Sequence, residues 1–126
     1  MTPDIPGAET VASWFGEWPS FHDAEILSVH INRGARSQIR VYTFVTTERR
    51  DPAGQFVRER EAIVVFELQN ITSLNLVGED ADRQNVIGGA TVEPAGDGWR
   101  LVLSPSYGLA GMIVAAEMSV RLERPS

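Results

Sequence analysis

The sequence predicts a mainly β protein, an antiparallel β-sandwich or open barrel of six to eight strands preceded by one short N-terminal helix. Three observations support this class. Short stretches rich in β-branched and aromatic residues recur along the chain, turn-forming residues separate them, and no second long helical pattern follows. Because parallel β/α folds need crossover helices between their strands, the pattern favours antiparallel pairing.

The chain has the length of one ordinary domain, so we expect a single domain over residues 1–126 with a loose segment at 1–7. The helix is expected over residues 8–15, and Gly16 ends it. Three apolar side chains in this stretch have the spacing of one helix face: Val11, Trp14 and Phe15.

The first strand is expected over residues 24–33, where period-two alternation predicts one apolar face formed by Leu27, Val29 and Ile31. The apolar start of the strand expected at 62–69 predicts burial on both faces. Residues 48–61 are charged and contain Pro52 and Gly54, which indicates a long loop or an extended hairpin tip. The other expected strands are 37–47, 74–76, 86–93, 99–103 and 114–123.

Composition excludes several classes of function. The net charge is −6, from 17 acidic residues and 11 basic residues that are all arginine, which disfavours binding to nucleic acid or to an anionic membrane. A basic protein partner suits this charge, although negative charge also simply keeps proteins soluble. The absence of cysteine excludes disulfides and thiolate metal sites. We expect a cytoplasmic protein, or one exported by a route that the sequence does not show, because the first residues do not resemble a signal peptide and residues 109–116, the longest apolar stretch, are too short to span a bilayer.

The pair His22-Asp23 is the first candidate for chemistry. Metal-dependent phosphohydrolases carry such a pair, but they need further histidine ligands, and this chain has only two histidines. The sequence contains no nucleophile elbow, phosphate loop or dinucleotide-binding glycine pattern. Asp23 and Glu25 share strand parity and could point the same way, although solvated acids at a strand entrance are commoner. We therefore expect no catalytic residues, no metal and no cofactor.

Aromatic residues are dense between Trp14 and Phe21, with Phe15 and Trp18 between them. Such a cluster can form an interaction hot spot or can plug one end of a sheet. The plug is the interpretation we favour, because aromatic side chains dominate cores as well as interfaces.

The segment from Trp18 to Val29, which contains Phe-His-Asp-Ala-Glu, resembles the start of immunity protein family 50, a bacterial family linked to polymorphic toxin systems. The resemblance covers about residues 14–123 and includes three later segments that are generic β patterns: Phe66-Glu67-Leu68, Leu74-Asn75-Leu76 and Asn85-Val86-Ile87. It implies a non-enzymatic protein that binds and neutralises a cognate toxin, and it transfers no catalytic residues.

We therefore expect a protein-binding function, with a basic toxin domain as the partner that suits the acidic chain. Two alternatives remain open: a small-ligand-binding or enzymatic β domain with a pocket near His22, and a structural interaction module that forms homo-oligomers. The candidate partner-binding residues are Glu79, Asp80, Asp82, His22, Asp23 and Glu25.

The acidic segment Gly78–Asp82 yields a first prediction. Glu79, Asp80 and Asp82 are so close together that they repel, and a basic partner would gain association rate from them. Changing all three to Gln or Asn should slow association with the cognate toxin at low salt and flatten its salt dependence, as measured by stopped-flow mixing. An unchanged rate and salt slope would remove this segment from the interface.

Overall fold

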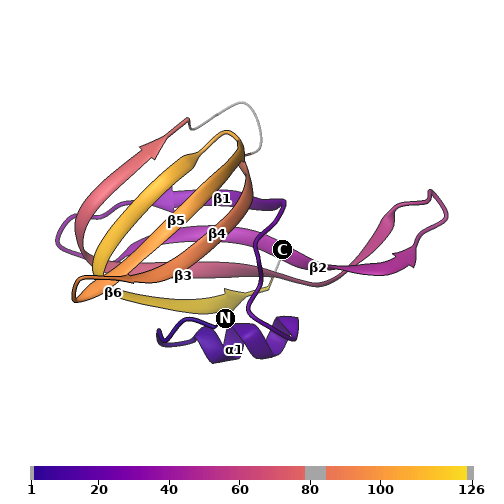
Figure 1. Cartoon of the computed structure of the whole chain (residues 1–126), viewed down its shortest axis with the longest axis horizontal. Helices are drawn as coiled ribbons and strands as arrows, with labels where there is room; N and C mark the ends of the chain where they lie inside the picture. Colours follow the sequence, from indigo (N-terminus) through magenta and orange to yellow (C-terminus); the bar gives the residue numbers. More distant parts are fainter. Residues whose placement is uncertain (1, 79–84, 125–126) are drawn as a thin grey trace.

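The computed structural model describes residues 2–78 and 85–124, and this part of the chain forms one helix and six strands. The mainly β, antiparallel prediction with one short helix is confirmed. Figure 1 labels the elements along the chain. Their bounds are α1 Ala8–Phe15, β1 Ala24–His30, β2 Ser37–Arg50, β3 Phe56–Val77, β4 Asn85–Ala95, β5 Gly98–Tyr107 and β6 Ala110–Glu123.

The sheet closes on itself in the order β1-β2-β3-β6-β5-β4. Closure comes from a short antiparallel ladder in which Ala24 of β1 pairs with Ile87 of β4, and Ile26 pairs with Asn85. The fold is therefore a closed barrel, where the sequence left a sandwich or an open barrel as the expected forms. A six-stranded barrel is narrower than the eight-stranded ones whose interior side chains just fill, so side chains occupy its centre.

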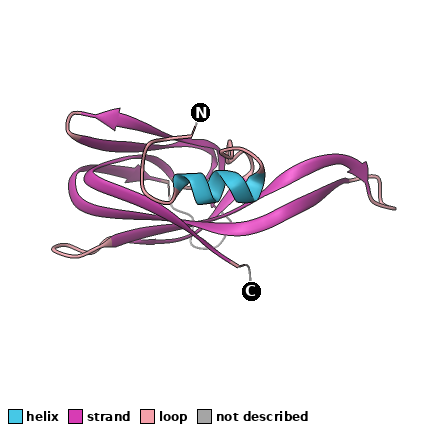
Figure 2. Cartoon of the chain, turned by 90° about the horizontal axis from the view of Figure 1, so that it is seen from below, coloured by secondary structure: helices cyan, strands magenta, loops and turns pink. Residues whose placement is uncertain are grey.

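Helix α1 covers the stretch of β6 that β5 leaves unpaired (Figures 1 and 2). Residues 5–7, within the segment that the sequence predicts to be loose, contact the barrel before the helix begins. Ile5 is buried, and Pro6 O accepts a hydrogen bond of 2.9 Å from Val120 N–H. Gly7 has φ +87°, and a Cβ there would lie 1.8 Å from Val120 O, so only glycine fits between helix and strand.

Strand β1 departs from the regular alternation that the sequence predicts. Its pairing with β2 shifts between Ile26 and Ser28, so Leu27 is the extra residue of a β-bulge and is 40% exposed. Ile31 follows the end of the strand and is also exposed. Leu27 and Ile31 therefore lie at the surface, and only Val29 of the predicted apolar face packs against the core.

Strand β3 joins the two strands expected at 62–69 and 74–76. A bulge between Ile71 and Ser73 shifts its pairing with β6 without interrupting the strand. Burial on both faces near its middle is confirmed, since Val64 and Phe66 face the interior while Ile63 and Val65 are buried on the outer side. Interior and outer residues alternate because successive strand side chains point to opposite faces.

The charged segment 48–61 forms an extended hairpin, which is one of the two forms predicted for it. Beyond Thr43, strands β2 and β3 leave the barrel as a two-stranded arm, visible on the right of Figure 1 and again in Figure 2. At its base, Trp14 Nε1–H of α1 donates to Arg60 O at 3.2 Å, and Arg60 Nη1 donates back to Trp14 O at 3.4 Å. The helix thereby holds the bulge at Arg60, which has φ +53°.

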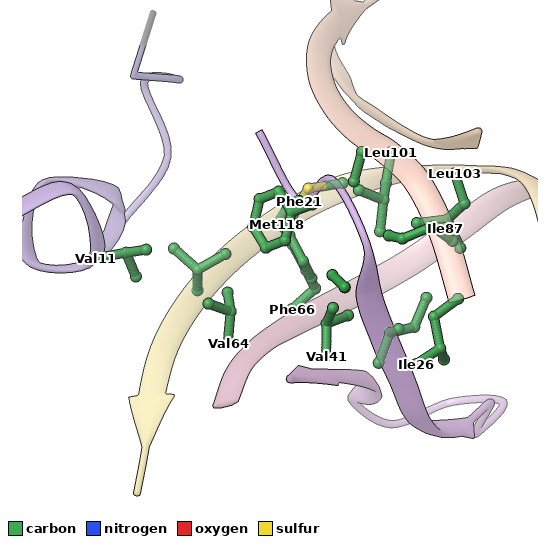
Figure 3. Close-up of a cluster of buried hydrophobic side chains, with 14 of the residues drawn as sticks. Val11, Phe21, Ile26, Val41, Val64, Phe66, Ile87, Leu101, Leu103 and Met118 are labelled. Atoms are coloured by element: carbon green, nitrogen blue, oxygen red, sulfur yellow. The ribbon is translucent and has the colours of Figure 1, made fainter. Parts of the chain in front are cut away.

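The core receives side chains from every element (Figure 3). Phe21 enters it from the segment before β1, and its ring lies 5.6 Å from that of Phe66 and 5.8 Å from that of Trp18. Only 1% of Phe21 and 4% of Phe15 is exposed, which confirms the plug at these residues, whereas Trp14 is 49% exposed and does not share the buried face of the helix that the sequence predicted for it. The labelled neighbours in Figure 3 are Val11, Ile26, Val41, Val64, Phe66, Ile87, Leu101, Leu103 and Met118.

Truncating this plug should be costly. Phe21→Ala should lower the free energy of unfolding by about 3–5 kcal/mol, because it removes a buried ring and leaves a cavity that the barrel cannot close. Urea titration of the purified variant measures the change. Val77→Ala is the control: Val77 is 62% exposed, so its loss should cost less than about 0.5 kcal/mol. Equal costs for the two variants would contradict the plug.

Candidate functional site

The His22-Asp23 pair lies in a tight turn that introduces β1. Phe21 and Asp23 both adopt left-handed backbone conformations, with φ +62° and +61°. Asp23 N–H donates to Ile87 O at 3.0 Å and Ala24 N–H donates to Phe21 O at 3.1 Å. These bonds fix the turn against β4 and direct Phe21 inward. The backbone of the Phe-His-Asp-Ala-Glu segment therefore has a structural role, whatever its side chains do.

The side chains of the pair point to solvent. His22 and Asp23 are 72% and 58% exposed, with His22 Nε2 lying 3.5 Å from Asp23 Oδ2 and Nδ1 lying 3.1 Å from Gly88 O. Glu25 lies on β1, where it is half-buried between the inward-facing Ala24 and Ile26. Because Asp23 belongs to a left-handed turn, the parity argument that aligned it with Glu25 does not apply. The structure thus brings His22 and Asp23 together, and in the described part of the chain they belong to no group of three His, Asp or Glu side chains that could hold a metal ion.

A notch of about 300 Å³ adjoins this turn, between the lead-in segment and the base of the arm. Its walls include Glu17, His22, Asp23, Phe44 and Thr46. The pocket near His22 that the alternative function requires is therefore present as a small open depression.

The acidic candidates Glu79, Asp80 and Asp82 lie outside the described residues. Among residues 2–78 and 85–124, no three His, Asp or Glu side chains converge on a point that could hold a metal ion. In the same part of the chain, no helix is long and apolar enough to cross a membrane.

A lattice of charges on the outer face was not predicted from the sequence. Glu123 Oε1 accepts from Arg40 Nη2 at 2.8 Å, and its Oε2 accepts from Arg121 Nη1 at 2.7 Å. Arg40 and Arg121 flank Val65 across the two neighbouring ladders, and Val65 is fully buried although it faces outward. The stems of the two arginines cover this apolar residue while their charged ends stay in contact with Glu123.

The same lattice continues towards the start of β2. Glu67 lies opposite Gln38 and Ser119, and it accepts from Gln38 Nε2 at 3.3 Å and from Arg36 Nη1 at 3.4 Å. Its other oxygen lies 3.5 Å from Arg121 Nε. The apolar run at 63–66 is the one sequence feature that indicates this arrangement. A strand that is apolar on both faces needs other side chains to shield each face from water, and on the outer face the arginines do this.

A second cluster forms near the arm. Tyr42 O–H donates to Glu61 Oε1 at 2.5 Å, and the Tyr42 and Phe44 rings pack edge to face at 5.9 Å. Burial, and then the bond to Glu61, raises the pKa of the Tyr42 hydroxyl above its ordinary value. Arg58 lies over the Phe44 ring at 3.9 Å, which adds a cation–π contact.

A groove of about 620 Å³ lies between the β1–β2 turn and strand β3. One wall consists of residues 31–35 and Ser37, and the other consists of residues 69–74. Arg33 and Glu117 are its charged lining residues, and the rest of the lining is neutral. Sequence reasoning missed this groove because its walls are distant in the chain. The one local signal was the absence of charge between Leu68 and Gly78.

Comparison with known proteins adds no relative: no family model, no curated protein and no solved structure matches the chain. The candidate site therefore depends on its own geometry. It consists of the neutral groove, the exposed His22-Asp23 turn with its notch, and the outer lattice of charges.

The outer lattice should make stability depend on pH. Hydrogen bonds from Arg40 and then Arg121 hold the pKa of Glu123 below its ordinary 4.5. A carboxyl with a lowered folded-state pKa contributes stability above its unfolded pKa and loses it as pH falls through the folded value. As pH falls from about 5 to about 3, the free energy of unfolding should therefore decrease less for Glu123→Gln than for the wild type. Chemical denaturation of both proteins at each pH measures the difference.

The matched control for that comparison is Glu93→Gln. Glu93 Oε1 contacts one arginine, Arg100 Nη1 at 2.9 Å, instead of bridging two. This variant should keep most of the wild-type acid sensitivity. If Glu93→Gln and Glu123→Gln flatten the pH dependence equally, the lattice at Glu123 has no special part in it.

Proposed function

We propose that this chain is a non-enzymatic protein-binding module of the immunity type, which binds a cognate bacterial toxin and neutralises it. The observation that carries the proposal is the groove between the β1–β2 turn and β3. Its lining is mostly neutral side chains and strand backbone, with Arg33 and Glu117 as its charged residues, and such a surface suits a bound protein segment.

Two further features support binding over catalysis. Side chains fill the barrel, so its centre has no room for a substrate. The arm of β2 and β3 projects from the barrel and adds little to the core, and a two-stranded ribbon is marginal in stability by itself. Such an element is better explained by contact with a partner than by folding. The resemblance of Trp18–Val29 to immunity protein family 50 points the same way.

The alternative, a small-ligand-binding or enzymatic domain, is supported by the notch beside His22. The two proposals differ in what the exposed pair does. In the alternative, His22 and Asp23 act on a bound molecule, whereas in the immunity-type proposal their side chains at most contact the partner surface.

The test is to search the genes beside this one for a toxin-like reading frame and to co-express its toxin domain with this chain. Wild-type protein should restore growth to cells that produce the toxin, and the two purified chains should form a complex in size-exclusion chromatography with light scattering. Growth arrest in the presence of the folded protein, together with the absence of a complex, would contradict the proposal. A stable homo-oligomer that ignores the toxin would favour the interaction-module alternative.

A double variant separates the remaining alternative. His22→Ala with Asp23→Asn should keep the fold, because the turn is held by backbone bonds, and should still protect cells from the toxin. Loss of protection with complex formation intact would indicate that the pair does chemistry. Loss of both would place the pair in the interface.

A further inference from the structure

Strand β3 is longer than the strand beside it. Its ladder with β2 ends where Ser37 pairs with Leu68, while its ladder with β6 continues to Val77. In the described chain, residues 69–77 therefore have a neighbour on the β6 side and none on the β2 side. Every second residue of such an edge directs its N–H and C=O groups away from the sheet, where they are free to pair with another strand.

Other open edges of this protein carry features that prevent pairing. The arm has charged side chains, among them Arg49, Arg58 and Glu59. Strand β4 carries Glu93 and Pro94 near its end, just before the turn to β5. The free edge of β6 is covered, because Val120 N–H bonds to Pro6 O. Charges, prolines and covering segments are the usual means by which proteins keep strand edges from pairing.

The edge at residues 69–77 is irregular at the bulge between Ile71 and Ser73 and at Asn70, which has φ +57°, but it lacks the charges and prolines of the other edges. Its sequence, QNITSLNLV, contains no charged residue and no proline. Residues 72–75 are exposed, and Leu74 is 45% exposed. An uncharged, accessible and partly apolar edge pairs readily with another strand, which is a hazard unless pairing is its purpose.

The surroundings of this edge determine what can occupy it. The β1–β2 turn stands opposite, and the groove of about 620 Å³ lies between them. The turn thus flanks the edge, and a second copy would have to bring its own flanking turn into the same space to pair with it. A single extended segment that protrudes from another protein can enter, since a strand needs only about 4.8 Å of spacing from its neighbour.

The lining sets the chemistry of that segment. Ile31, Ile71 and Leu74 offer apolar contacts, and most of the remaining side chains are neutral and polar. Arg33 and Glu117 are the charged lining residues, and a charged side chain placed against Ile31, Ile71 or Leu74 would lose hydration without gaining a partner from these apolar residues. Alternating apolar residues, by contrast, would pack beside these three side chains as they do in cross-strand pairs.

We propose that an extended, uncharged segment of the protein partner adds to the barrel as a strand along residues 69–77 of β3. The main chain of the edge supplies the hydrogen bonds, and the groove supplies contacts for alternate side chains. This inference rests on the proposed protein-binding function and names how the partner is held.

The test uses a phage-displayed library of random peptides, selected on the intact chain. Selected peptides should be uncharged with alternating apolar residues, and their binding should slow hydrogen exchange of the amides at residues 69–77. Leu74→Lys places a charge on the edge and should weaken peptide binding about tenfold or more. Leu27→Lys makes the same change at the exposed β1 bulge, outside the groove, and should alter binding by less than about twofold.

Several outcomes would overturn the proposal: no peptide is selected, Leu74→Lys and Leu27→Lys bind the peptides equally, or exchange at 69–77 stays unchanged. A dimer of the chain that Leu74→Lys dissociates would assign the edge to a second copy and would also overturn it. The toxin experiment separates the two proposals. If Leu74→Lys binds the toxin as the wild type does, strand addition fails and the immunity-type function stands. If the wild type binds peptides along this edge but binds no toxin, strand addition stands and the immunity-type function fails.

Discussion

Phe21 enters the barrel from a segment that precedes the first strand, and the closed sheet depends on how that segment is held. The left-handed residues Phe21 and Asp23 bend the chain sharply, so the ring turns inward while β1 begins beside β4. The bond from Asp23 N–H to Ile87 O joins the turn to β4 at the point where the ring of strands closes. Left-handed backbone at non-glycine residues costs free energy, and burying an aromatic ring against Phe66 and Trp18 offsets that cost.

The length of β3 explains the two features that distinguish this barrel. The strand runs from Phe56 to Val77, whereas β1 spans only Ala24–His30 and β6 begins to pair with β3 at Ile63. At one end the excess of β3 pairs with β2 alone and forms the arm. At the other end it pairs with β6 alone and forms the edge at residues 69–77. Both proposed contact elements therefore come from one mismatch in strand length.

The middle of β3 is apolar on both faces, so both faces must be shielded from water. Inside, Val64 and Phe66 belong to the core; outside, Val65 lies beneath the arginines that Glu123 bridges. Exposed ion pairs stabilise a protein only slightly by charge alone. Here the arginine stems also remove apolar surface from water, so the lattice joins packing and charge in one arrangement.

Local sequence determined the fold class and the helix. Glycines at both ends delimit residues 8–15, and the β-branched stretches set a period that any strand must follow. The sequence also indicated the plug at Phe21 and the double burial of β3. It did not indicate the bulge at Leu27, the joining of 62–69 with 74–76, or the closure of the sheet. These features depend on which strands pair with each other, and the periodicity of a single strand does not specify its partner.

The candidate site divides in the same way. His22 and Asp23 stood out because they are adjacent in sequence, and the tertiary structure showed that their turn holds the core while their side chains face solvent. The groove could not be foreseen, since its walls come from residues 31–35 with Ser37 and from residues 69–74, and they meet only when β2 and β3 pair. Spacing along the chain determines elements, because periodicity is local. A binding edge exists only where a neighbouring strand ends early, and the tertiary pairing of strands of unequal length decides that.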